Sequence, residues 1–149
     1  MKQLVVFIFL ILVGTPNSFA YGYGHALLTK STFAPNDKKP PGQVFTTCRI
    51  FEDKVELSFS CDGIVSRTTK PINFSGILNT VIDNASKPEV EETPDYTPGV
   101  EHVQYIANKI HADGRAEVVF LGGTGRYHLV NNSDAAKTLR IILDEHCKN

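Results

Sequence analysis

A glycine-rich stretch, VVFLGGTGRYHLV at residues 118–130, has the residue types of a phosphate-binding loop. A P-loop needs G-x-x-x-x-G-K-[ST], and a dinucleotide-binding loop needs G-x-G-x-x-G at the start of a helix. Here the glycine spacing differs, no lysine follows, and the residues after Gly125 have strand propensity without a helical period. We therefore expect a β-hairpin turn, because glycine adopts the positive φ angles that such turns require.

Histidines are the next candidates for chemistry, because several of them together could bind zinc. No pair has H-x-x-x-H or H-x-H spacing, and no C-x-x-C occurs. We expect exposed or edge-strand histidines, and the sequence predicts no metal and no cofactor. The five are His25, His102, His111, His128 and His146.

Catalytic arrangements are equally hard to find. No G-x-S-x-G nucleophile elbow occurs. Carboxylates gather only in residues 89–101, where a solvated loop is a poor scaffold for a pair of catalytic carboxyls. The sequence therefore favours a protein without catalytic activity. The alternative is a small exported hydrolase whose site is assembled from scattered residues, such as His102 or His128 near Asp113.

The first twenty residues predict a signal peptide. Lys2 precedes an apolar run from Leu4 to Val13, and small residues lead to a cleavage point after Ala20. The run is shorter than the ~20 apolar residues that span a membrane. We expect a soluble domain at residues 21–149 without a membrane anchor, exported to the periplasm or fully secreted.

Three cysteines in an exported chain allow one internal disulfide and leave one thiol. We favour Cys48–Cys147, which would tie a strand to the final helix, with Cys61–Cys147 as the alternative. The thiol of Cys61 then lies outside the bond or links two chains. A monomer and a Cys61-linked dimer both remain open.

Residues 44–61 alternate apolar and polar side chains and predict a β-hairpin. A two-residue turn at Asp53-Lys54 would place Cys48 opposite Phe59. Cys48 and Cys61 would then share a face but lie diagonally, so a bond between them would strain the hairpin. Further strands are expected near residues 64–69, 100–110, 115–121 and 126–130.

Two helices are predicted, at residues 75–86 and 133–146, because their apolar residues recur with a helical period. Asn73 or Ser75 could cap the first helix. Three N-x-S triplets, beginning at Asn73, Asn84 and Asn131, could accept glycans or act as caps, and we favour caps. The pattern as a whole predicts an α+β domain with a mainly antiparallel sheet of about 5–6 strands and both helices packed on one face.

The charge balance gives no broad positive field, since the formal net charge is −1, and nucleic acid is not an expected partner. Residues 87–99 form an acidic segment with three prolines, and such long connections are often functional. We expect this segment to bind an unidentified protein or peptide, such as a basic partner, and an inhibitor of an exported hydrolase would fit the same description. A structural envelope component is a third possibility. The proposed contact residues are Glu89, Glu91, Glu92, Asp95 and Tyr96.

Overall fold

The computed structural model describes residues 25–36, 42–61, 64–86, 90–92, 101–124 and 129–148. The predicted signal peptide and most of the acidic segment lie outside this part of the chain. The described elements follow one another in this order: β1 Leu28–Asn36, β2 Gly42–Ile50, β3 Lys54–Cys61, β4 Ile64–Pro71, α1 Ile77–Ala85, β5 Val90–Glu92, β6 His102–Ile110, β7 Ala116–Gly123, β8 Leu129–Asn131 and α2 Asp134–His146.

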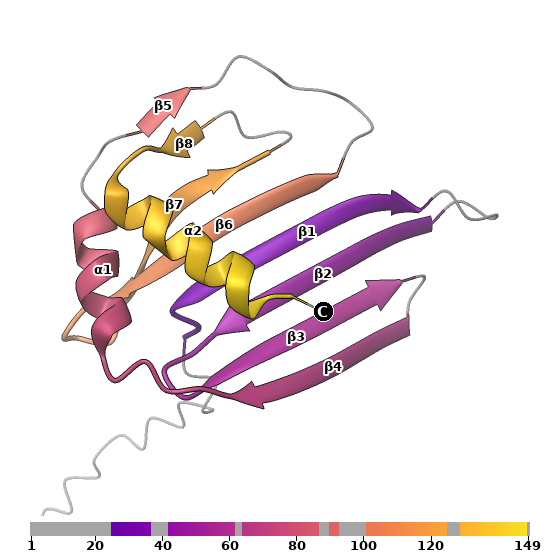
Figure 1. Ribbon diagram of the computed structural model, residues 1–149, viewed down its shortest axis with the longest axis horizontal. Helices are drawn as coiled ribbons and strands as arrows, with labels where there is room; N and C mark the ends of the chain where they lie inside the picture. The colour runs from indigo at the N-terminus through magenta and orange to yellow at the C-terminus, as the bar shows by residue number, and fades with distance from the viewer. Residues whose placement is uncertain are drawn as a thin grey trace, which may run out of the picture.

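Six strands form one antiparallel sheet in the order β4-β3-β2-β1-β6-β7, and β5 pairs with β8 in a second, two-stranded sheet (Figure 1). Few residues separate β2 from β3, β3 from β4 and β6 from β7 along the chain, which explains why these strands are neighbours. Within the six-stranded sheet, the pairing of β1 with β6 joins segments that are distant in the chain, and in the second sheet the pairing of β5 with β8 does the same. The predicted α+β class with a mainly antiparallel sheet is therefore confirmed.

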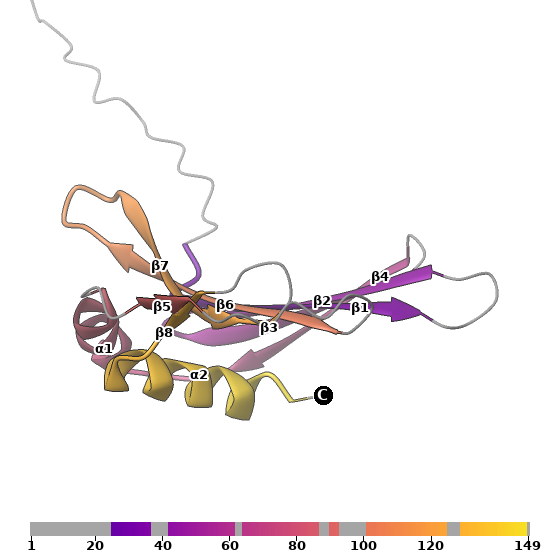
Figure 2. The same cartoon turned by 90° about the horizontal axis from the view of Figure 1, so that it is seen from above.

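The helix α2 lies along one side of the six-stranded sheet, and α1 lies at one end of the sheet beside α2 (Figure 2). Both helices are close to their predicted bounds, because each has a strong apolar stripe. The packing of both helices on one face is not confirmed. The sheet continues beyond the last turn of α2, so part of its helix-side face is not covered by that helix (Figure 1).

The hydrophobic core lies between the helices and the end of the sheet that they cover. The strands contribute Leu28, Ile50 and Ala107, all completely buried, and α2 contributes Leu139 and Leu143. Leu78 and Ile82 of α1 extend the same cluster. Burial of a side chain of this size stabilises the fold by ~1.5–3 kcal/mol, so the covered end supplies most of the hydrophobic stabilisation.

The helix starts differ from each other. Ser133 caps α2 as expected, since its hydroxyl accepts a hydrogen bond from the Ala136 amide at 3.2 Å. The expected cap of α1 by Asn73 or Ser75 is wrong, because the N-cap position is Gly76 without a side-chain cap. Instead, the Glu52 carboxylate accepts from the Gly76 amide, while Asn73 accepts from the Ser75 amide at 2.9 Å one residue earlier.

The hairpin between β2 and β3 forms with a different turn from the one expected. Ile50 pairs with Val55 and Cys48 with Leu57, so the predicted pairing of Cys48 with Phe59 is wrong. The Phe51 amide donates to the Lys54 carbonyl at 2.8 Å, which places Glu52 and Asp53 at the turn. The register therefore shifts by two residues, and each side chain stays on its predicted face of the sheet.

The glycine-rich stretch is not a simple hairpin turn. Gly122 and Gly123 belong to β7 and pair with β6 beside a β-bulge, whereas β8 pairs with β5. A Cβ atom on Gly123 would lie 2.6 Å from the Val103 carbonyl oxygen, so a glycine is needed for close strand approach. Gly122 has a φ of +146° and also needs to be glycine. Residues 125–128 lie outside the described part of the chain.

Candidate functional site

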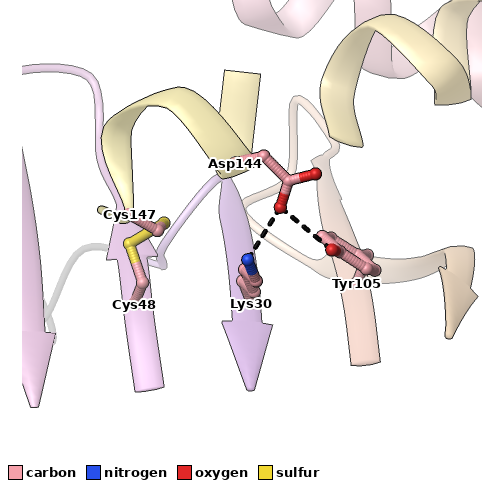
Figure 3. Close-up of a disulfide and its surroundings, with 5 residues drawn as sticks. All are labelled: Lys30, Cys48, Tyr105, Asp144 and Cys147. Atoms are coloured by element: carbon pink, nitrogen blue, oxygen red, sulfur yellow. Dashed lines mark hydrogen bonds and ion pairs between the residues drawn. A yellow bond between two sulfur atoms is a disulfide. The ribbon is translucent and has the colours of Figure 1, made fainter. Parts of the chain in front are cut away.

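One polar cluster joins the last turns of α2 to three neighbouring strands (Figure 3). Asp144 accepts hydrogen bonds from the Lys30 ammonium at 2.7 Å and from the Tyr105 hydroxyl at 2.9 Å. Cys147 forms a disulfide with Cys48. Tyr105, Lys30 and Cys48 are register partners on β6, β1 and β2, so α2 is attached to one row across the sheet.

The electrostatics of this cluster fit a structural role. Burial lowers the pKa of Lys30, but the hydrogen bond to Asp144 and the charges of Tyr105 and Asp144 together outweigh burial, and the pKa lies above its ordinary value. Burial, followed by the hydrogen bond to Asp144, raises the pKa of Tyr105. Both groups therefore keep their protons more firmly than in water, which suits a permanent ion pair and not a proton donor.

The predicted disulfide Cys48–Cys147 is confirmed and closes a separation of 99 residues. Cys61 lies at the end of β3 opposite Val44, four residues along the strand from the partner of Cys48. In the observed register Cys61 lies four residues along β3 from the partner of Cys48, whereas the expected register placed it only two residues away. The Cys61-linked dimer stays a prediction.

The residues suggested for a hydrolase are not brought together. His102 begins β6 and Asp113 follows its other end, so about 27 Å of strand separates them. Asp113 instead pairs with Arg115 at 2.5 Å, and this contact lowers the pKa of the exposed Asp113 carboxyl. The proposed pairing of His102 with Asp113 is wrong, and His128 lies outside the described residues.

The other predicted site residues are mostly beyond what the structure describes. Glu91 and Glu92 belong to the short strand β5, whose backbone pairs with β8. Glu89, Asp95 and Tyr96 lie outside the described part of the chain. Among the described side chains, no group of three metal-ligating residues forms.

The N-x-S triplets have different surroundings. Asn131 is 2% exposed and its side-chain amide donates to the Ala85 and Phe120 carbonyls, so it is a structural residue. Asn84 is exposed on α1 and donates to the Thr80 carbonyl, while Asn73 accepts from Ser75. Capping by Ser133 is thus the role of the third triplet.

The face of the six-stranded sheet opposite α2, here called the open face, carries the best candidate for a binding surface. The register aligns side chains of this face in rows across β6, β1 and β2. The end row consists of His102, Phe33 and Phe45, and the rings of His102 and Phe33 stack with centroids 6.2 Å apart. The next row consists of Gln104, Ser31 and Thr47.

A hollow of about 200 Å³ lies over these two rows and is mainly apolar. Phe45 borders it and remains 44% exposed, which is high for a phenylalanine on a folded domain. Ser31, Gln104 and Thr124 add hydroxyl and amide groups to its lining. The hollow therefore combines aromatic rings for apolar contact with a few polar groups that can orient a ligand.

This surface was not predicted, because the predicted strand at residues 44–50 was assigned apolar contacts on one face only. The opposite face carries Phe45, Thr47 and Arg49, a pattern that is visible in the sequence. Phe33 lies in a segment without a clear period, and its pairing with Phe45 depends on the hairpin register. An apolar residue on the second face of an antiparallel strand is the signal that could have been used.

Comparison with known proteins adds no relative to this description, since no known family, curated protein or solved structure matches the chain. Within the described part of the chain, neither helix has the length and apolar character needed to cross a membrane.

Proposed function

We propose that this chain is a small exported binding protein without catalytic activity, which holds a partner on the open face of its sheet. The observation that carries this proposal is the aromatic row of Phe33, Phe45 and His102, which lines a hollow and in which Phe45 is 44% exposed. No helix among the described residues covers that face. Exposed aromatic side chains of this kind are enriched where proteins contact their partners.

Export is supported by two observations. The Cys48–Cys147 disulfide is of the kind that persists in oxidising compartments. Residues 1–20 have the charge, apolar run and small residues of a signal peptide. The proposed working location is therefore the periplasm or the extracellular space.

The chemistry of the hollow points to a partner with an apolar or aromatic group flanked by hydrogen-bonding groups. The rings of Phe33 and Phe45 can pack against such a group. Ser31 and Gln104 lie in the next row and can hydrogen-bond to its polar neighbours. An exposed side chain of a protein or peptide would meet both conditions.

The test compares two phenylalanines of nearly equal exposure that point to opposite faces. Phe45 on β2 is 44% exposed on the open face, and Phe59 on β3 is 42% exposed on the helix side. A partner captured from the native exported fraction is purified and its affinity measured for wild type, Phe45→Ser and Phe59→Ser. We expect Phe45→Ser to weaken binding by at least ~10-fold, equivalent to ~1.4 kcal/mol, and Phe59→Ser to leave it unchanged.

A third variant addresses the acidic segment as an alternative surface. Deletion of residues 89–97 should leave the affinity unchanged if the open face carries binding. Loss of binding in the deletion, with wild-type affinity in Phe45→Ser, would reject the open face and support the acidic segment. Thermal unfolding of each variant separates loss of a contact from loss of the fold.

A further inference from the structure

A second hollow, of about 220 Å³, lies on the open face over β2, β3 and β4. Its lining differs from that of the aromatic hollow, because it is formed mainly by charged and hydroxyl side chains. The lining residues are Thr47, Arg49, Glu56, Leu57, Ser58, Arg67 and Thr69.

Two arginines flank this hollow from either side of the intervening strand. Arg49 lies on β2 opposite Glu56 of β3. Arg67 lies on the edge strand β4 opposite Ser58 of β3, in the neighbouring row. Both arginines are exposed. Strands lie ~4.8 Å apart and rise ~3.4 Å per residue, so the two Cα atoms are about 12 Å apart, close enough for both guanidinium groups to reach one anion.

The arginines are not used by the fold itself. Within the described part of the chain, neither guanidinium makes a hydrogen bond or an ion pair with another side chain. The one carboxylate in the hollow, Glu56, is paired with Lys54 at 2.8 Å. The hollow therefore has an excess of positive charge, although the full chain is formally at −1.

We propose that this second hollow binds a tetrahedral oxyanion, a phosphate or sulfate group, carried by the partner. Arginine matches such groups with paired hydrogen bonds, and two arginines balance a double negative charge. Thr47, Ser58 and Thr69 supply hydroxyl donors between the two guanidinium groups. Donors arriving from two sides and from below suit a tetrahedral group better than a planar carboxylate.

The proposal deepens the proposed function and rests on it in one respect, namely that the oxyanion belongs to the same partner. Phe45 and Arg49 are four residues apart on β2, with Thr47 between them lining the second hollow. Four residues of strand span about 13 Å. The partner would then carry an apolar group and an oxyanion separated by about this distance.

The test titrates the disulfide-bonded protein with sodium phosphate, sodium sulfate and sodium acetate at constant ionic strength, and follows backbone amide resonances by NMR. We expect saturable shifts at Thr47, Ser58 and Thr69 with phosphate or sulfate. Arg49→Met and Arg67→Met keep an apolar stem and should each weaken binding by about tenfold. Arg115→Met, an exposed arginine paired with Asp113, is the matched control and should change nothing.

Each outcome decides the proposal. Tighter binding of phosphate or of sulfate identifies the source of the oxyanion. Equal binding of acetate, or unchanged binding in both arginine variants, overturns the tetrahedral oxyanion site. Phe45→Ser should leave the phosphate titration unchanged, so failure of partner capture and failure of the anion site are distinguishable.

Discussion

Asn131 shows how one buried polar residue can hold several segments together. Its amide nitrogen donates to the Ala85 carbonyl at 2.9 Å and the Phe120 carbonyl at 3.2 Å. Its side-chain oxygen accepts from the amide of Ser133 at 3.1 Å and from the Ser133 hydroxyl at 2.8 Å. These bonds connect the end of α1, β7 and the start of α2. A substitution that removes the amide of Asn131 should therefore destabilise the fold.

Asn131→Asp should lower the free energy of unfolding by about 3 kcal/mol at pH 7, because a buried carboxylate would face two carbonyl oxygens that lose their donor. Below the carboxyl pKa the protonated acid can donate again, so part of the loss should be recovered near pH 4. Urea unfolding at both pH values measures the effect. Asn79→Asp, on the exposed side of α1, is the control. If both variants lost the same free energy of unfolding, the buried hydrogen bonds of Asn131 would not contribute more to stability than an exposed side chain does.

The Lys30–Asp144 pair predicts a loss of stability in alkaline solution. The folded-state pKa of Lys30 lies above 10.5. Its contribution is therefore fully present below the unfolded pKa and is lost as the pH rises through the folded pKa. The raised pKa of Tyr105 has the same sign. The difference in unfolding free energy between wild type and Asp144→Ala should be constant up to about pH 10 and shrink above it.

This comparison needs a background in which the disulfide is stable at high pH. Thiolates attack disulfides, so both proteins should carry Cys61→Ser. Urea unfolding between pH 7 and 11 gives the pH profile. A difference that grows above pH 10 would mean that the pair does not contribute in the direction of the pKa shift.

Among the elements, α2 is held by hydrogen bonds at its middle, and by the disulfide together with the hydrogen bonds of Asp144 at its C-terminal end. Arg140 donates to the carbonyls of Leu121 and Asn131, which holds the middle of the helix to β7 and β8. Cys147 holds its end to β2. Removal of the disulfide should therefore release the last turn more than the first.

Cys48→Ala combined with Cys147→Ala should lower the free energy of unfolding by about 4–5 kcal/mol, the value expected for a closed loop of about a hundred residues. Urea unfolding monitored by circular dichroism measures the loss. Cys61→Ala, which lies outside the disulfide, should change stability by less than ~1 kcal/mol. A loss below ~1 kcal/mol in the double variant would mean that hydrogen bonds and packing alone hold α2.

The elements also show which features a sequence can predict. Alternation along β2 and β3 correctly assigned each residue to a face, but a shift of two residues leaves those faces unchanged. The register then depends on the turn, and neither Glu52-Asp53 nor Asp53-Lys54 has strong turn chemistry. The aromatic row was missed for the same reason, since Phe33, Phe45 and His102 meet only through strand pairing.

For the molecule as a whole, the two ends of the sheet should differ in local stability. Leu28, Ile50 and Ala107 are completely buried beneath the helices, whereas Ile64 at the opposite end is 74% exposed. Local opening of the end of the sheet away from the helices exposes little apolar surface. Its free energy should therefore be lower than that of global unfolding. Hydrogen exchange by NMR should show the slowest amides at Leu28 and Ala107 and much faster exchange at Val44 and Cys61. Uniform protection along the strands would show that the sheet opens only as one unit.

The order of the cysteines in the chain also affects how the protein matures. Cys147 follows Cys48 by 99 residues, and Cys61 lies between them. At a synthesis rate of ~5–20 residues per second, Cys48 and Cys61 would emerge roughly 5–20 s before the native partner of Cys48. In an oxidising compartment a premature Cys48–Cys61 bond can form in this interval and must then be exchanged. Cys61 thus competes with Cys147 for Cys48 during maturation. A chain with Cys61→Ser should reach the native disulfide without an isomerase.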